Sequence, residues 1–157
     1  MKTVNIYTDG ACRGNPGDGG WGVLIKYENT SKEIYGGEKN TTNNKMELMA
    51  AIEGLKALNE SCKVNLTTDS KYVMQGITSW INNWKKNNWK SSTKKDVKNK
   101  DLWLLLDKYV SMHEIKWFWV KGHSGHEENE IADMLANRGI DQLLSLIHIS
   151  EPTRRTT

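Results

Sequence analysis

The sequence of 157 residues is poor in cysteine and proline and contains no long apolar run. Its two cysteines, Cys12 and Cys62, cannot form a disulfide framework, and their spacing does not match a zinc site. No segment approaches the roughly 20 apolar residues that a membrane helix needs, and the N-terminus, where we expect the mature chain to begin, lacks the apolar core of a signal peptide. We therefore expect a cytoplasmic protein without a membrane partner.

The charge of the chain is unevenly distributed. The net charge is only +3, but residues 85–100 contain seven lysines and one acidic residue, Asp96, so the rest of the chain is acidic on balance. A basic cluster can hold a polyanion, because each phosphate contact releases condensed counterions. The alternative is a solvated lysine-rich surface. Tryptophans interleaved with the lysines favour the binding interpretation.

The first half of the chain changes from strand-like to helical spacing. Residues 4–8, 21–27 and 32–38 have the β-branched and aromatic content of strands joined by short turns, with a glycine-rich loop over residues 10–20. These strands indicate an antiparallel meander. Apolar residues at helical spacing then predict a helix over residues 43–59. Its N-cap candidates are Thr41, Thr42 and Asn43. Its predicted buried face contains Leu48, Ile52, Leu55 and Leu58.

The second half alternates strands and helices. We predict strands over residues 64–68 and 114–120 and helices over 102–110 and 127–142, together with a helix from Ser70 that is interrupted near Gly76 and continues over 79–84. This alternation indicates parallel pairing with right-handed crossovers. The predicted fold is an α/β mixed sheet with helices on both faces.

Residues 143–157 continue no helical pattern. We predict a domain over residues 1–142, followed by a tail that is non-native or disordered. A genuine tail that folds on a partner is the alternative.

Four acidic residues occupy positions where a site can form. Asp9 ends the first predicted strand, and Asp69 ends a later strand directly before a helix. Ligand sites in open α/β sheets favour such strand ends. Glu47 lies on a helix face that continues through small residues, which let the helix approach the sheet, and Asp133 lies in the last helix. Taken singly, these residues are more typical of a turn, a helix cap or a solvated helix surface.

Converging carboxylates repel one another unless cations bind them. Hard oxygen ligands select Mg²⁺ or Mn²⁺, and two such ions can assist an in-line phosphoryl transfer. The sequence shows no serine–histidine or cysteine–histidine arrangement that indicates a nucleophile pair.

Several segments together resemble ribonuclease H type 1. They are TDGACRGNPG (residues 8–17), TTNNKMELMAA (41–51), TDS (68–70), VKGHSGHEENE (120–130) and AD (132–133). The resemblance spans about residues 3–142, with the motifs in the family's order. Any one of them alone is weak, but their combination is specific.

The resemblance implies a five-stranded mixed sheet flanked by helices. It assigns catalytic metal binding to Asp9, Glu47, Asp69 and Asp133, with Mg²⁺, or Mn²⁺ as its substitute, and two ions when substrate is bound. It also places His123 in a flexible loop beside the site, as a residue for proton transfer or product release. A histidine suits that role because its charge changes near neutral pH.

The resemblance further implies that the substrate is an RNA–DNA hybrid, which a protein distinguishes by its 2′-hydroxyl groups. Lys71 stands where relatives often have glutamine, and a lysine cannot accept a hydrogen bond. The basic segment resembles a protrusion that grips the DNA strand. The implied contacts near the site are Cys12, Asn15, Asn43 and Asn44, and those of the basic segment are Trp80, Trp84, Lys85, Lys86 and Lys90. For the tryptophans, packing at the base of the protrusion is the alternative.

The leading hypothesis is a monomeric endoribonuclease that cleaves the RNA strand of RNA–DNA hybrids and leaves 3′-hydroxyl and 5′-phosphate ends. A catalytically silent hybrid-binding module would lack at least one of the four carboxylates, and none is missing. A related nuclease that acts on DNA would need neither the adjacent asparagines Asn43 and Asn44 nor the basic segment.

Overall fold

The computed structural model describes residues 1–91, 93–122 and 126–156, with side chains through residue 143. The strands are β1 (Lys2–Gly14), β2 (Gly17–Tyr27), β3 (Thr30–Thr41), β4 (Cys62–Thr68) and β5 (Glu114–Trp119). The helices are α1 (Asn43–Lys56), α2 (Lys71–Gln75), the π-helical η1 (Gly76–Trp80), α3 (Ile81–Lys86), α4 (Lys100–Val110) and α5 (Glu127–Thr156).

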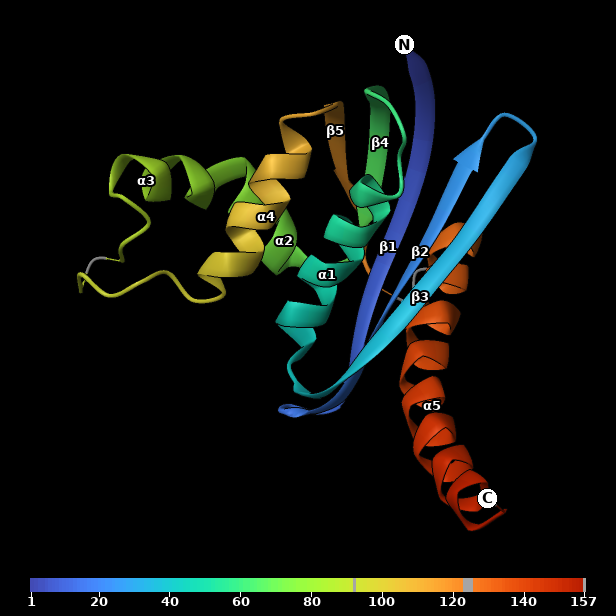
Figure 1. Ribbon diagram of the computed structural model, residues 1–157. Coiled ribbons are helices and arrows are strands. Elements are labelled where there is room, and N and C mark those ends of the chain that lie inside the picture. Colours follow the sequence, from blue (N-terminus) through green and yellow to red (C-terminus); the bar gives the residue numbers. More distant parts are fainter. Residues whose placement is uncertain (92, 123–125, 157) are drawn as a thin grey trace.

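The five strands form one mixed sheet in the order β3-β2-β1-β4-β5. The pairs β1–β2 and β2–β3 are antiparallel, whereas β1–β4 and β4–β5 are parallel. α1 packs on β1 and β2 and against α4, while α5 crosses the opposite side of β1, β2 and β3 (Figure 1). This arrangement confirms the predicted α/β mixed sheet with helices on both faces.

The glycine-rich segment over residues 10–20 was predicted as a loop, and that prediction was wrong. It forms the turn end of the β1–β2 hairpin, in which Gly10 pairs with Trp21 and Gly14 pairs with Gly17. The glycines are explained by packing on the sheet. A Cβ on Gly20 would overlap the Ala136 carbonyl of α5. The missing side chains therefore let a helix lie directly on the strand.

α1 begins and packs as its sequence pattern predicts, although it ends at Lys56 instead of residue 59. Thr42 is the N-cap, and its side chain accepts a hydrogen bond from the Lys45 N–H at 3.3 Å. Of the predicted inner positions, Leu48, Ile52 and Leu55 are buried, whereas Leu58 lies beyond the end of α1 and is half-buried. Together with the buried side chains of β1 and β4, the three buried residues form the core on this face of the sheet.

The helical segment after β4 is interrupted at Gly76, as predicted. α2 ends there, and the π-helical turn η1 leads into α3. A Cβ on Gly76 would overlap the ring of Trp103, which is fully buried. The glycine therefore makes room for the largest side chain of the core.

α5 continues to Thr156, beyond the predicted end at residue 142. Its buried face includes Ala132, Leu135, Ala136 and Ile140. Once these residues hold a helix on the sheet, each further residue adds one backbone hydrogen bond without a new nucleation cost. In the part of the chain that the structure describes, no helix combines the length and apolar character that crossing a membrane requires.

Candidate active site

Asp9 and Asp69 are brought together by the pairing of two parallel strands. Thr8 of β1 pairs with Thr68 of β4, so the next residues along both strands lie side by side. Asp69 directly follows β4, as predicted. Asp9 does not end its strand, since β1 continues to Gly14 in the hairpin with β2. The two carboxylates nevertheless meet at the end of the β1–β4 ladder.

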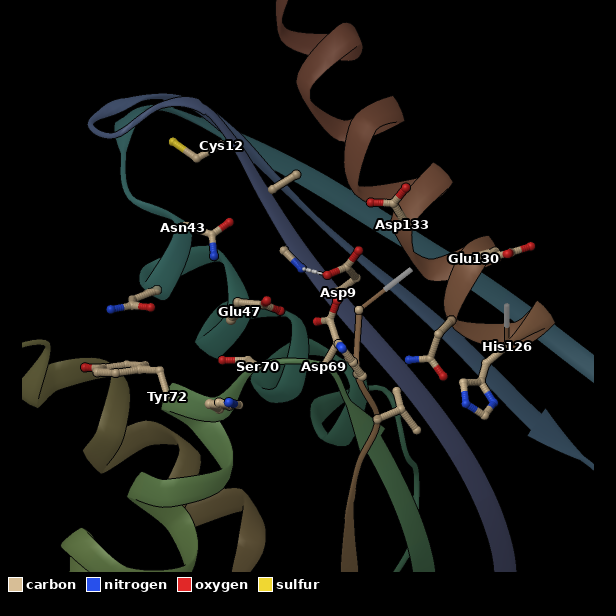
Figure 2. Close-up of a pocket in the computed structure, with 18 residues that line it drawn as sticks. Asp9, Cys12, Asn43, Glu47, Asp69, Ser70, Tyr72, His126, Glu130 and Asp133 are labelled. Atoms are coloured by element: carbon tan, nitrogen blue, oxygen red, sulfur yellow. Dashed lines mark hydrogen bonds between the residues drawn. The ribbon is translucent and has the colours of Figure 1, made fainter. Parts of the chain in front are cut away.

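Glu47 reaches the same place because α1 lies very close to β1. A Cβ on Gly10 would come within 2.5 Å of the Glu47 backbone nitrogen, so only glycine allows this approach. Gly54 of α1 also lies close to β1, since a Cβ there would come within 3.1 Å of an Ile6 methyl group, as the small residues of this helix predicted. Figure 2 shows the Asp9, Glu47 and Asp69 side chains pointing toward one another.

Asp133 completes the group from α5, on the other face of the sheet (Figure 2). Asp9, Glu47 and Asp69 each offer an oxygen within 4.8 Å of the others. The predicted convergence of these three carboxylates is therefore confirmed. Asp133 faces Asp9 closely enough to interact with its carboxyl group.

Asp9 and Glu47 are buried within this cluster, which raises the pKa of both carboxyl groups. Burial, followed by the charge of Asp69 and then by hydrogen bonding to Asp133 and Asp69, raises the pKa of Asp9 to about 9. Burial and the charges of Asp9 and Asp69 also raise the pKa of Glu47. Such a cluster favours a bound proton or a bound cation over three unpaired negative charges.

The oxygen atoms of the cluster fit a divalent cation. Glu47 Oε1 and Asp69 Oδ1 are buried, and neither has a hydrogen-bond partner. Asp9 Oδ1 accepts a hydrogen bond from the Gly10 N–H at 2.9 Å, which orients this carboxylate. A buried oxygen without a donor is costly, and an all-oxygen donor set suits hard cations such as Mg²⁺. The site is therefore suited to divalent metal ions.

The carboxylates line a pocket of about 520 Å³, and the predicted contact residues Cys12, Asn43 and Asn44 lie on its wall. Asn15 does not line the pocket. Instead, its side-chain oxygen accepts a hydrogen bond from the Asn43 N–H at 3.3 Å, which ties the β1–β2 turn to the start of α1. The Cys12 thiol donates to the Thr41 carbonyl at 3.4 Å. These hydrogen bonds therefore connect the hairpin end of β1 to the end of β3 and to the start of α1.

The sequence model of the RNase H family matches residues 1–141. The chain belongs to the RNase H family. A ribonuclease H from Alcanivorax borkumensis is 64% identical over 143 residues, covering 91% of this chain and 95% of the relative. These matches make the chain a hydrolase of the ribonuclease H class, and this family depends on divalent metal ions.

Solved structures support the same family and fold. The type 1 RNase H LC9-RNase H1, which carries the type 2 active-site motif, is 32% identical, with a TM-score of 0.83 over 90% of this chain and 74% of that chain. A foamy viral protease–reverse transcriptase in complex with an RNA/DNA hybrid shares the fold at 22% identity, with a TM-score of 0.76 over 88% of this chain and 20% of that chain.

The pocket of this RNase H family member contains residues that our sequence interpretation did not assign. They include Tyr72, His126, Asn129 and Glu130. The Nδ2 atom of Asn129 is buried without a hydrogen-bond partner. Its spacing to Asp133 was the available signal, because residues four apart on a helix share a face. The predicted proton-transfer residue His123 lies outside the described residues.

The predicted substrate contacts of the basic segment lie away from the pocket. Trp80 and Trp84 are half-buried and contact each other, with ring centroids 5.9 Å apart. Trp84 also packs edge-on against Trp103, at 5.2 Å. The packing alternative therefore accounts for much of this aromatic cluster. The lysines 85, 86 and 90 are exposed.

Proposed function

We propose that this chain hydrolyses the RNA strand of an RNA–DNA hybrid and leaves 3′-hydroxyl and 5′-phosphate ends. The observation that carries the proposal is the carboxylate cluster, in which oxygens of Asp9, Glu47 and Asp69 from three separate elements lie within 4.8 Å of one another. With Asp133, these residues are the proposed ligands of Mg²⁺, or of Mn²⁺ as a substitute, with two ions when substrate is bound. Such ions supply the positive charge that stabilises a phosphoryl-transfer transition state.

The protein's own contribution is to hold the acidic ligands in place. The Gly10 N–H orients the Asp9 carboxylate, and the burial of Glu47 excludes water from its carboxyl group. Because all of these ligands are in strands and helices or next to them, little reorganisation is needed when cations bind. His123 is the proposed residue for proton transfer or product release.

The proposed recognition of the hybrid uses two surfaces. Cys12, Asn43 and Asn44 on the pocket wall, with Asn15 behind them, are suited to the RNA strand, because an asparagine amide can both donate to and accept from a 2′-hydroxyl. The basic segment is suited to the phosphates of the DNA strand. Its proposed contacts are Trp80, Trp84, Lys85, Lys86 and Lys90. We infer that a monomer acts in the cytoplasm and that residues 1–142 carry the function.

Cleavage assays test this proposal. Labelled RNA–DNA hybrid, duplex DNA and duplex RNA are each incubated with the protein in Mg²⁺ and in chelator. We expect only the RNA strand of the hybrid to be cut, and only with Mg²⁺. Cleavage of duplex DNA would favour the DNA-acting alternative, and binding without cleavage would favour the silent module.

The variant Asp9→Asn tests the carboxylate site itself. We expect cleavage to fall by at least about a hundredfold, because the metal ligand is lost, while hybrid binding persists. The matched control is Asp18→Asn, since Asp18 lies on β2 outside the pocket. Wild-type turnover by the Asp9 variant would refute the metal-site assignment.

A further inference from the structure

Lys71 brings a positive charge to the wall of the acidic pocket. It is the first residue of α2, it is exposed, and it lines the pocket two residues after Asp69. Its Nζ atom lies 5.3 Å from the centroid of the Trp119 ring. This distance is within the range of a cation–π contact, which holds an ammonium group over an aromatic face. The lysine is therefore less free than an ordinary surface lysine.

Trp119 connects Lys71 to the metal site. It is the last residue of β5 and pairs with Thr68, the last residue of β4. Its indole N–H donates to the backbone carbonyl of Asp69 at 3.1 Å. One side chain thus contacts both the ammonium group of Lys71 and the backbone of a predicted metal ligand.

The pocket wall is mainly acidic, so the position of the Lys71 ammonium group matters for an anionic substrate. Carboxylates greatly outnumber lysines on its wall, where the acids are Asp9, Glu47, Asp69, Glu130 and Asp133 and the lysines are Lys71 and Lys121. An approaching phosphodiester therefore meets more acidic than basic groups on this wall, and a lysine beside them offsets part of the repulsion. An ammonium group donates hydrogen bonds and accepts none, so an anionic oxygen is its best partner.

We propose that Lys71 binds a backbone phosphate of the hybrid beside the carboxylate site and that Trp119 is the positioning residue that holds Lys71 there. This inference rests on the proposed function and adds a phosphate contact to it. A glutamine at position 71 would be suited to sugar or base contacts, whereas the lysine adds a charge whose contribution depends on salt concentration.

The experiment compares Lys71→Gln with Lys63→Gln, an exposed lysine of β4 that lies outside the pocket. Hybrid affinity is measured against salt concentration in an Asp9→Asn background, and KM and kcat are measured in the otherwise wild-type protein. One lost phosphate contact lowers the slope of log K against log salt by about 0.7–0.9. We expect this decrease for Lys71→Gln, with KM raised more than kcat is lowered, and an unchanged slope for Lys63→Gln.

Two substitutions test the role of Trp119. Trp119→Leu removes the aromatic face, so we expect the same decrease in slope, with no further decrease in the double variant with Lys71→Gln. Trp119→Phe keeps an aromatic face but cannot donate to Asp69, so we expect most of the slope to remain. A loss of activity without a change of slope in Trp119→Leu would overturn the positioning role.

An unchanged slope for Lys71→Gln, in a protein that cleaves hybrids, would overturn the phosphate contact and leave the proposed function intact. Failure of the wild-type protein to cleave hybrid with Mg²⁺ would instead overturn the proposed function.

Discussion

Asp9 is a carboxylate buried beside other carboxylates. Its relative exposure is only 6%, and its pKa is raised to about 9 by burial and by the neighbouring acids. In the absence of metal, Asp9 of the folded protein therefore stays protonated up to a much higher pH than Asp9 of the unfolded chain does. The buried carboxylates that form the cation site thus lower the stability of the metal-free protein.

The pH dependence of stability follows from this residue. Since the pKa of Asp9 is raised in the folded state, its contribution is fully present below about pH 4 and is lost as the pH rises toward about 9. We expect Asp9→Asn to raise the free energy of unfolding of the metal-free protein by about 1–3 kcal/mol near pH 8. Urea unfolding in chelator at about pH 5 and about pH 8 measures the effect.

Two controls accompany this measurement. Asp18→Asn should leave unchanged the difference in the free energy of unfolding between about pH 5 and about pH 8. Added Mg²⁺ should stabilise the wild-type protein more than the Asp9→Asn variant, because binding to the folded state adds to its stability. An equal gain from Mg²⁺ in both proteins would contradict the assignment of Asp9 as a ligand.

At the scale of elements, a histidine connects the start of β4 to the turn between α4 and β5. His113 Nδ1 accepts a hydrogen bond from the Cys62 N–H at 3.1 Å, which requires an unprotonated nitrogen. Burial lowers the pKa of His113 below its ordinary value of 6.5. Protonation therefore favours the unfolded chain.

We expect the contribution of His113 to the free energy of unfolding to fall as the pH drops through about 6.5 toward the lower pKa of folded His113. His113→Phe should weaken this acid-side dependence and cost about 1 kcal/mol at neutral pH, because the Cys62 N–H loses its acceptor. Urea unfolding between about pH 5 and about pH 7 tests this. His126→Phe is the control, since His126 is exposed. An undiminished acid-side dependence in His113→Phe would disprove the role of this bond.

The contact between α5 and the sheet depends on glycine. A Cβ on Gly22 would overlap the Ala132 carbonyl, one residue before Asp133. We expect Gly22→Ala to destabilise the protein by about 2–4 kcal/mol, since backbone atoms must move to make room. In Gly54→Ala the new Cβ would meet only side-chain methyl groups, at 3.1 Å, and alanine favours the helix. Thermal unfolding should therefore show a clearly smaller loss for Gly54→Ala, and equal losses would contradict this packing argument.

At the scale of the whole molecule, negative and positive surfaces are separated. The carboxylates lie where β1, β4, α1 and α5 meet (Figure 2), whereas α3 and the basic loop after it extend away from the sheet (Figure 1). Two of the three predicted lysines already form ion pairs: Lys85 with Asp107 at 2.9 Å and Lys90 with Asp96 at 2.6 Å. These exposed pairs are weak enough to be exchanged for phosphate contacts.

We expect replacement of Lys85, Lys86 and Lys90 by glutamine to raise KM and to lower the salt slope of hybrid binding by up to about 2–3. Lys86→Gln alone should lower the salt slope by the amount expected for one phosphate contact, because no ion pair of Lys86 is found in the described structure. Binding titrations at several salt concentrations measure the slope, and Lys32→Gln on β3 is the control. An unchanged slope in the triple variant would remove the basic segment from the binding surface.

Much of this architecture could be predicted from local sequence. The helical spacing of Leu48, Ile52 and Leu55 predicted α1 because a buried helix face repeats along the chain itself. The strand before Asp69 and the break at Gly76 were predicted for similar local reasons. The four carboxylates were selected by position and by family resemblance, without knowledge of the distances between them.

Tertiary structure alone decided where those carboxylates meet. The Thr8–Thr68 pairing joins residues 60 positions apart, and no local pattern sets that register. Gly10 and Gly20 lie in a segment that resembles a loop in sequence, and Gly22 lies in a predicted strand, but in the structure the missing side chains of all three make room for α1 or α5. A residue's type shows what chemistry it can perform, whereas its distance from other residues depends on contacts between segments that are far apart in the chain.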